Sequence, residues 1–256
     1  MLRLGKDAYR YVAFRPSQFR GVYENFRQAE AAVPRGKRIG YNHEALARQY
    51  QAQLNRHLDN SDYPILYHLD HILTDACTIL DFGGNVGVHY LRYRKYLGLE
   101  KVVWIVCDVP EITKIGRETC AGRSNVKFID DIDELKEPKI DIFLACDALQ
   151  YVEWQDSLLQ RLVDKGVRPR HVLLDQLPLY GGQRFVTLQN GGLVYYPQYV
   201  FNREEYIGAV ANLGYELVDA WDCSNASCVI PFYPDKSFHP YSGLYFCDRS
   251  RAGSDR

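Results

Sequence analysis

The residues best suited to bind a ligand lie in one short stretch, residues 78–90, which reads TILDFGGNVGVHY. An apolar run ends in an acid, breaks into glycines and resumes with helical spacing, which predicts a strand, a tight loop and a helix. Glycine lets the backbone approach a ligand and adopt positive φ, and asparagine is the next most tolerant residue. We therefore expect a nucleotide-like ligand at this loop, bound by Asp81, Gly83, Gly84, Asn85 and Gly87.

Two alternatives exist for this loop. A dinucleotide-binding turn has the spacing G-x-G-x-x-G. Counted from Gly83, Asn85 stands at the second glycine position and Val88 at the third, so nicotinamide or flavin binding is disfavoured. The other alternative is a tight strand-to-helix turn that binds no ligand, and the stretch by itself leaves it open.

A second acid closes the next strand-like run. Residues 101–107 form an apolar run typical of a buried strand, and Asp108 follows, 21 residues beyond Gly87. In this kind of sheet the end of the second strand faces the ribose, where a carboxylate can accept both hydroxyls. We expect Asp108 to bind ribose. The alternative is that Asp108 caps the helix predicted over 110–120, since Asp followed by Pro is a helix start.

Polar residues also follow later strand-like runs. Asp130 and Asp131 come after residues 126–129, and Asp147, Gln150 and Tyr151 come after residues 140–146. Side chains at the C-terminal ends of parallel strands point into the crevice where ligands bind. Asp147 is therefore expected in the ligand site. The alternative for Tyr151 is aromatic packing under the sheet.

The remaining chain supplies the elements that position these residues. A fifth strand is predicted over 171–176, a hairpin insert around Asn190 and Gly191 over 178–200, and two last strands near the end of the chain. Asn202 is expected to cap the helix that follows the insert, with Glu205 at the capping-box position.

The first 75 residues have mainly helical spacing, over 23–32, 44–58 and 64–73. We expect a helical N-terminal cap at 1–75 that covers the ligand cleft. A ligand-binding domain at 76–250 and a disordered tail at 251–256 complete the predicted organisation.

Composition excludes several classes of protein. The 256 residues are 46% hydrophobic and 25% charged, as in an ordinary soluble globular chain. The formal net charge is −1 and the only basic bias lies in the first forty residues, so nucleic acid is not expected as a partner. There is no leader and no long apolar run, which predicts a cytoplasmic location without a membrane span. Seven cysteines without a C-x-x-C pair predict free thiols and no metal site.

The pattern resembles a known family. The acid-x-Gly-Gly-Asn-x-Gly spacing resembles motif I of class I S-adenosylmethionine (SAM)-dependent methyltransferases, with Asn85 where many members have a third glycine. Within that class the chain looks like a bacterial family often associated with surface-polysaccharide and lipopolysaccharide gene clusters. The matching motifs are Ile-Leu-Asp-Phe-Gly-Gly, Trp-x-Val-x-Asp-x-Pro at 104–110, Leu149-Gln150-Tyr151, Tyr196-Pro197 and Gly214-Tyr215. Asp108 and Asp175-Gln176 depart from it, since glutamate and an arginine segment are more usual there.

This resemblance implies an α/β Rossmann-like fold, with a seven-stranded, mostly parallel sheet that includes an antiparallel edge strand. It implies SAM as cofactor, with Asp130 or Asp131 receiving the adenine amino group. Gln150 and Tyr151 are then the main candidates to contact both methyl donor and acceptor. The implied activity is O-methylation of a sugar, a glycan or another small hydroxylated acceptor.

A base is expected only if the acceptor is a hydroxyl of high pKa. The candidates are Tyr151, His239 and His43, with Glu153 as a further choice, while His89 is expected to pack or cap beside the glycine loop. A chain that binds SAM without transferring a methyl group is the alternative from a non-enzymatic class, and a nicotinamide oxidoreductase is a third. The sequence leaves a homodimer open.

Overall fold

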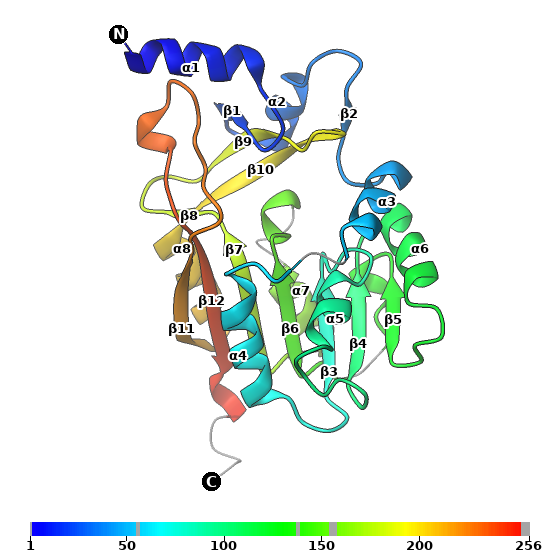
Figure 1. Ribbon diagram of the computed structural model, residues 1–256. Coiled ribbons are helices and arrows are strands. Elements are labelled where there is room, and N and C mark those ends of the chain that lie inside the picture. The colour runs from blue at the N-terminus through cyan, green and yellow to red at the C-terminus, as the bar shows by residue number, and fades with distance from the viewer. Residues whose placement is uncertain (1, 55–56, 137–138, 154–157, 252–256) are drawn as a thin grey trace.

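The strand, loop and helix predicted at residues 78–90 are present in the computed structural model, which describes residues 2–54, 57–136, 139–153 and 158–251. The strand is β3 (Thr78–Phe82) and the helix is α5 (Val88–Tyr93). β3 belongs to a seven-stranded sheet in the order β11-β12-β7-β6-β3-β4-β5 (Figure 1). The other strands are β4 (Val103–Cys107), β5 (Val126–Ile129), β6 (Ile142–Cys146), β7 (His171–Leu177), β11 (Tyr215–Cys223) and β12 (Tyr241–Asp248).

The direction of the strands follows the predicted pattern. β3 to β7 are parallel, and β12 is antiparallel to both of its neighbours, β7 and β11. The antiparallel strand therefore lies one position in from the edge, which β11 occupies. The chain order changes direction between β3 and β6, and ligands in open α/β sheets bind at such a switch point, beyond the carboxyl ends of the strands.

Helices cover both faces of this sheet because its strands are apolar on both sides. One face packs on α7 (Leu158–Asp164) and α8 (Arg203–Asn212), and its core includes Leu80, Ile105 and Phe143. The other packs on α4 (Asp62–Ile72) and α5, and its core includes Ile79, Trp104 and Leu144. Between these layers the sheet is a fixed support for the loops at its carboxyl end.

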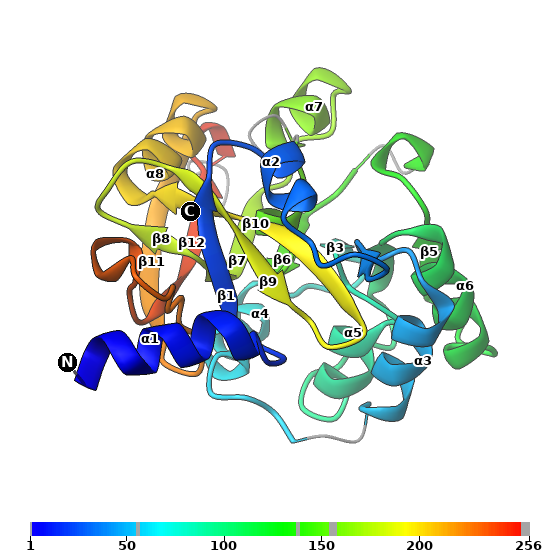
Figure 2. The same cartoon turned by 90° about the horizontal axis from the view of Figure 1, so that it is seen from above.

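A second sheet combines strands of the N-terminal segment with strands of the insert after β7. The predicted hairpin is β9 (Phe185–Asn190) and β10 (Val194–Asn202), joined at Gly191 and Gly192. β1 (Phe19–Tyr23) pairs with β9, and β2 (Arg38–Ile39) and β8 (Leu179–Tyr180) pair with β10. Figures 1 and 2 show this sheet above the carboxyl ends of β6 and β7.

The N-terminal segment, predicted as a mainly helical cap, is therefore only partly helical. It contains α1 (Leu2–Ala13), α2 (Phe26–Ala31), α3 (Glu44–Ala52) and α4, but also β1 and β2. The helix expected from residue 23 begins at Phe26, because Phe19–Tyr23 pairs with β9, and such a distant partner leaves no local signal in the sequence. Three predictions concern residues that the structure does not describe: the helix across residues 55–56, the helix start at residues 154–157 and the tail at residues 252–256.

Two other expectations can be compared with the structure. All seven cysteines are free thiols, and six of them are buried. Within the described residues, no helix combines the length and apolarity needed to cross a bilayer.

Asn202 caps α8 as predicted, since its side-chain oxygen accepts a bond from the Glu205 N–H at 2.9 Å. We expect Asn202→Ala to lower the free energy of unfolding by about 1–2 kcal/mol, because one N–H of the first turn loses its acceptor. Urea denaturation at neutral pH measures this change. The control Glu204→Ala alters an exposed side chain in the same turn, and an equal loss in both variants would contradict the capping role.

Candidate active site

A cavity of about 680 Å³ lies at the carboxyl ends of β3 to β7. The loops after these five strands line it, together with parts of the N-terminal segment and of β10. The N-terminal segment contributes these lining residues: Phe26, Glu30, Ile39, Gly40, Tyr41, Tyr50, Gln53, Asp59 and Asp62.

The glycine loop has the backbone that its sequence predicts. Gly83, Asn85 and Gly87 all have positive φ, +69°, +60° and +86°, so Asn85 does adopt a conformation that glycine usually takes. Gly83 and Asn85 line the cavity. Gly84 and Gly87 are buried and do not line it. Gly84 leaves room for Asp81, since a Cβ there would be 2.3 Å from the Asp81 carboxylate.

Asp81 lies beneath the loop and does not contact the cavity, in contrast to the predicted ligand contact. Its carboxylate is fully buried and accepts bonds from Trp104 Nε1 at 2.9 Å and from His89 Nδ1 at 2.9 Å. Burial lowers the pKa of the His89 imidazole, but Asp81 outweighs this effect and raises the pKa above its usual value. Asp81 therefore fixes His89, a lining residue, and favours its cationic form.

Asp108 lines the cavity beside the glycine loop, as expected. Its two oxygens accept bonds from the backbone N–H of Asn85 at 2.9 Å and of Val109 at 2.8 Å. Burial raises the pKa of Asp108 to about 6, against the opposing effect of these two bonds. The helix-cap alternative is not observed, because the N-cap residue of α6 (Pro110–Thr119) is Val109. Each oxygen keeps a lone pair for a further donor.

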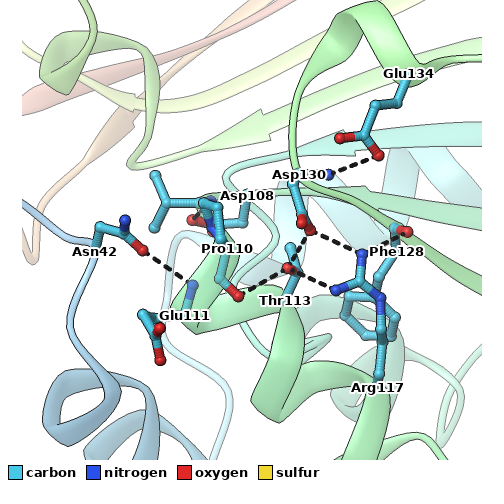
Figure 3. A network of polar contacts seen from close by, with 10 residues as sticks. Asn42, Asp108, Pro110, Glu111, Thr113, Arg117, Phe128, Asp130 and Glu134 are labelled. Carbon is cyan, nitrogen blue, oxygen red and sulfur yellow. Dashed lines mark hydrogen bonds and ion pairs between the residues drawn. The ribbon is translucent and has the colours of Figure 1, made fainter.

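Asp130 and Asp131 both line the cavity at the end of β5, but each carboxylate already has partners. Figure 3 shows Asp130 turned toward Thr113 and Arg117; it accepts from the Thr113 hydroxyl and pairs with Arg117 at 2.7 Å. Asp131 accepts from the Asp133 N–H at 2.8 Å.

Figure 3 also shows how the N-terminal segment is joined to the start of α6. The Asn42 side-chain oxygen accepts a bond from the Glu111 N–H at 3.0 Å.

The ends of β6 and β7 carry two more residues with positive φ, Asp147 at +52° and Gln176 at +54°. Both line the cavity, and residues held in this region cluster at functional sites. Asp147 accepts bonds from Gln150 Nε2 at 2.5 Å and from the Tyr151 hydroxyl at 3.4 Å. The surrounding protein raises the pKa of Asp147 to about 7, through desolvation first and the nearby Asp175 carboxylate second. Asp147 is therefore a carboxyl group that titrates near neutral pH.

Gln150 is fully buried and does not line the cavity, contrary to its predicted contact with ligands. Its amide nitrogen donates to Asp147 and, at 3.4 Å, to the Gln176 carbonyl oxygen. Gln150 thus orients the Asp147 carboxylate without itself reaching the cavity.

Tyr151 lines the cavity, so the alternative of packing under the sheet is not observed. Its ring contacts Tyr41 and Tyr196 at centroid distances of 5.1 and 5.0 Å, and those two rings stack at 4.5 Å. The Tyr151 hydroxyl donates to Gln189 Oε1 at 2.9 Å. Burial and the Asp147 carboxylate raise the pKa of Tyr151 well above its usual range, so this phenol remains protonated at neutral pH.

The other two predicted bases lie outside the cavity lining. His43 precedes α3, and its Nε2 is 3.2 Å from the Ile39 carbonyl oxygen. His239 Nε2 is 3.0 Å from the Ser224 carbonyl oxygen. The His43 ring contacts backbone of the N-terminal segment, and the His239 ring contacts backbone of the last loop. Neither lines the cavity, contrary to the prediction for these two histidines. Glu153 does not line it either.

Several lining residues were not predicted from the sequence. Arg92 follows His89 by one turn of α5, a spacing that could have identified it, and its Nε is buried without a partner. Tyr41 and Tyr50 come from the N-terminal segment expected over the cleft, but nothing in the sequence marked either as a ligand contact. Tyr196 is one of the tyrosines of the predicted hairpin insert and part of the Tyr196-Pro197 motif. Among the described lining residues, His89 and Arg92 are the basic ones, and eight are acidic: Glu30, Asp59, Asp62, Asp108, Asp130, Asp131, Asp147 and Asp175.

No protein-family model matches this sequence, and no curated protein is similar to it. Solved structures are similar in fold. The complex of the Haloferax volcanii Trm112 methyltransferase activator and a methyltransferase contains a chain with TM-score 0.57 and 14% identity, over 81% of this chain and 95% of that one. A SAM-dependent methyltransferase from Listeria monocytogenes gives 0.52 and 14%, over 73% and 99%.

A third similar structure is magnesium protoporphyrin IX methyltransferase from Synechocystis with bound S-adenosylhomocysteine (SAH), at TM-score 0.51 and 12% identity, over 81% of this chain and 95% of that one. The chain therefore has the Rossmann-like fold of the class I SAM-dependent methyltransferases, as the sequence pattern predicts.

Proposed function

We propose that this protein is a SAM-dependent methyltransferase that methylates a hydroxyl group of a sugar, a glycan or another small hydroxylated acceptor. The observation that carries the proposal is the position of Asp108. In this fold its carboxylate lies in the cavity beside the glycine loop, at the end of β4 and one strand away from the switch point between β3 and β6.

The residues present fit SAM. The free lone pairs of Asp108 suit the two ribose hydroxyls, and Val109, Ile112 and Ile132 supply an apolar wall for the adenine. Asp130 and Asp131 are near enough to this wall to remain candidates for the adenine amino group. The buried Nε of Arg92 and the imidazole of His89, whose pKa Asp81 raises, suit the carboxylate of the methionine part, because they are the basic groups of an otherwise acidic lining.

The acceptor end is formed by Tyr41, Tyr151 and Tyr196, near Asp147. Tyrosine rings offer flat apolar faces with polar tips, which suit the faces and hydroxyls of a sugar ring. Carboxylates exceed basic groups in this lining, so an anionic acceptor would be repelled. We therefore propose an uncharged hydroxylated acceptor.

Bound SAM supplies an electrophilic methyl group that an acceptor oxygen attacks in line. We assign the base to Asp147, which the sequence places among the cofactor ligands. A base works best when its pKa is close to the working pH, and Asp147 meets this condition, whereas Tyr151 stays protonated. Gln150 donates to Asp147 and holds its carboxylate while it takes the proton of the acceptor hydroxyl. The Tyr151 hydroxyl shares its one proton between Gln189 Oε1 at 2.9 Å and Asp147 at 3.4 Å.

Asp108→Ala should raise the dissociation constant for SAH by tenfold or more, because a carboxylate shared by two hydroxyls contributes about 1.5–3 kcal/mol. Isothermal titration calorimetry with the full-length protein measures this change. Asp147→Ala is the matched control, since it removes a lining carboxylate that is not assigned to the cofactor. Equal binding by Asp108→Ala and the unaltered protein would remove the ribose assignment.

The pH dependence of SAH binding tests the same carboxylate. Its raised pKa, about 6, means that the ionised fraction falls by roughly tenfold between about pH 7 and pH 5, and affinity should fall with it. Asp108→Asn should remove most of this dependence, while Asp147→Asn should keep it. The opposite pattern would assign the titration to Asp147.

Release of SAH from SAM is the decisive assay of the proposed transfer. We expect turnover with a neutral member of a panel of sugars, glycans and small phenols, and at least about tenfold less with the matching uronic acid or sugar phosphate, because like charges in the cavity raise the cost of binding. Mass spectrometry of both products measures it. SAH binding without turnover across the panel would support the non-catalytic alternative, and faster reaction with the anionic acceptors would contradict the proposed acceptor class.

With an acceptor found in that panel, Asp147→Asn should lower kcat by about a hundredfold or more, because an amide cannot take the proton. In the unaltered protein kcat should rise with pH as Asp147 ionises, reach half of its plateau at about pH 7 and level off above about pH 8. Calorimetry with SAH checks that Asp147→Asn still binds the cofactor. A variant that keeps the full rate would show that Asp147 is not the base.

A further inference from the structure

Helix α1 turns its apolar side chains to the solvent, whereas an ordinary surface helix turns them to the core. Leu4, Ala8 and Val12 follow one another at a spacing of four, and Leu4 and Val12 are 66% and 81% exposed. The polar side faces the protein: Asp7 accepts a bond from the Phe232 N–H at 3.3 Å, and Arg10 lines a small cavity of about 140 Å³.

The attachment of α1 to the protein is slight. From Leu4 to Val12 no side chain is buried, and Phe14, just beyond the helix, is the first that is. The aromatic contacts of α1 are few: the Tyr11 ring lies 5.7 Å from the Phe232 ring and 5.4 Å from the Arg20 guanidinium, and the Tyr9 ring lies 5.3 Å from the Arg15 guanidinium. A 12-residue helix is marginal in water unless its apolar face is packed. Within the described part of the chain, the apolar face of α1 has no such packing.

A neighbouring loop enlarges this apolar area. Phe232 and Tyr233, between β11 and β12, are 45% and 39% exposed. Figures 1 and 2 show the loop between these strands beside α1. We call the combined area the α1 surface; it consists of Leu4, Ala8, Tyr9, Val12, Phe232 and Tyr233.

The charge around the α1 surface is positive, although the whole chain is nearly neutral. Residues 1–20, which contain α1 and the start of β1, have five Lys and Arg against one Asp, whereas the whole chain has 31 Lys and Arg against 32 Asp and Glu. Lys6 and Arg10 are exposed on α1 itself. An apolar face with aromatic rings and a basic opposite face is typical of helices that lie in the interface of an anionic bilayer.

We propose that the α1 surface docks on an anionic phospholipid bilayer, with the helix in the headgroup region and without crossing the membrane. A second copy of the chain is a less suitable occupant, because it would bring two basic N-terminal segments together. The proposal does not depend on the proposed methyl transfer, and its test uses no acceptor.

The test is co-sedimentation of the full-length protein with vesicles. We expect binding to vesicles of phosphatidylcholine with about one third phosphatidylglycerol, weak binding to phosphatidylcholine alone, and loss of binding at about 0.5 M salt. The double variant Leu4→Glu with Val12→Glu should bind the anionic vesicles at least about tenfold more weakly, because two inserted apolar side chains become charged. The control, Tyr96→Glu with Val218→Glu, replaces residues that are 61% and 55% exposed elsewhere, and should bind like the unaltered protein.

Three outcomes would overturn the proposal. The first is an unaltered protein that binds neither kind of vesicle. The second is a Leu4→Glu, Val12→Glu variant that binds as tightly as the control, with both variants folded by circular dichroism. The third is a dimer in solution that this double variant converts to a monomer, without vesicle binding by either protein, which would assign the α1 surface to pairing of copies.

Discussion

The hydrogen bond from the Asn85 N–H to the Asp108 carboxylate joins the loop after β3 to the end of β4, and the shape of the candidate site depends on this contact. Asn85, which donates this bond, is in the left-handed region with φ of +60°. The bond requires both strands to end at the same edge of the sheet, which the parallel register of Phe82 with Cys107 provides. The ligand-facing carboxylate is thus positioned by backbone rather than by another side chain.

The cofactor end of the cavity is formed by two neighbouring strands, whereas the acceptor end is formed by residues from three separate segments. Tyr41 comes from the N-terminal segment, Tyr151 from the turn after β6 and Tyr196 from β10, and their rings meet above the main sheet. Tyr41 and Tyr196 depend on the pairing of β2, β9 and β10 in the second sheet, whereas Tyr151 is positioned by the main sheet. Changes in that sheet can therefore alter the acceptor end while the cofactor end, fixed by β3 and β4, stays the same.

The electrostatic surroundings of the two lining carboxyl groups, Asp108 and Asp147, differ. Desolvation raises the pKa of both Asp108 and Asp147, to about 6 and about 7, and the proximity of other carboxylates adds to the shift. Two backbone N–H groups oppose the rise at Asp108, whereas Asp147 has side-chain donors and the Asp175 carboxylate nearby. Asp108 is therefore suited to remain an anion that accepts hydroxyls, and Asp147 is suited to exchange a proton. The same excess of carboxylates makes His89 and Arg92 the places where an anionic group can bind.

The sequence by itself determined the main sheet, because each of its parallel strands is an apolar run followed by glycine, acid or helix signals that act locally. For the same reason the glycine loop, Asp108 and the Asn202 cap could be predicted. Only the tertiary structure decided that β1 pairs with β9, that Asp81 and Gln150 support other residues, and that His43 and His239 lie outside the cavity while Tyr41 and Tyr196 line it. These outcomes depend on contacts between segments far apart in the chain. The type and spacing of residues within one segment do not predict such contacts.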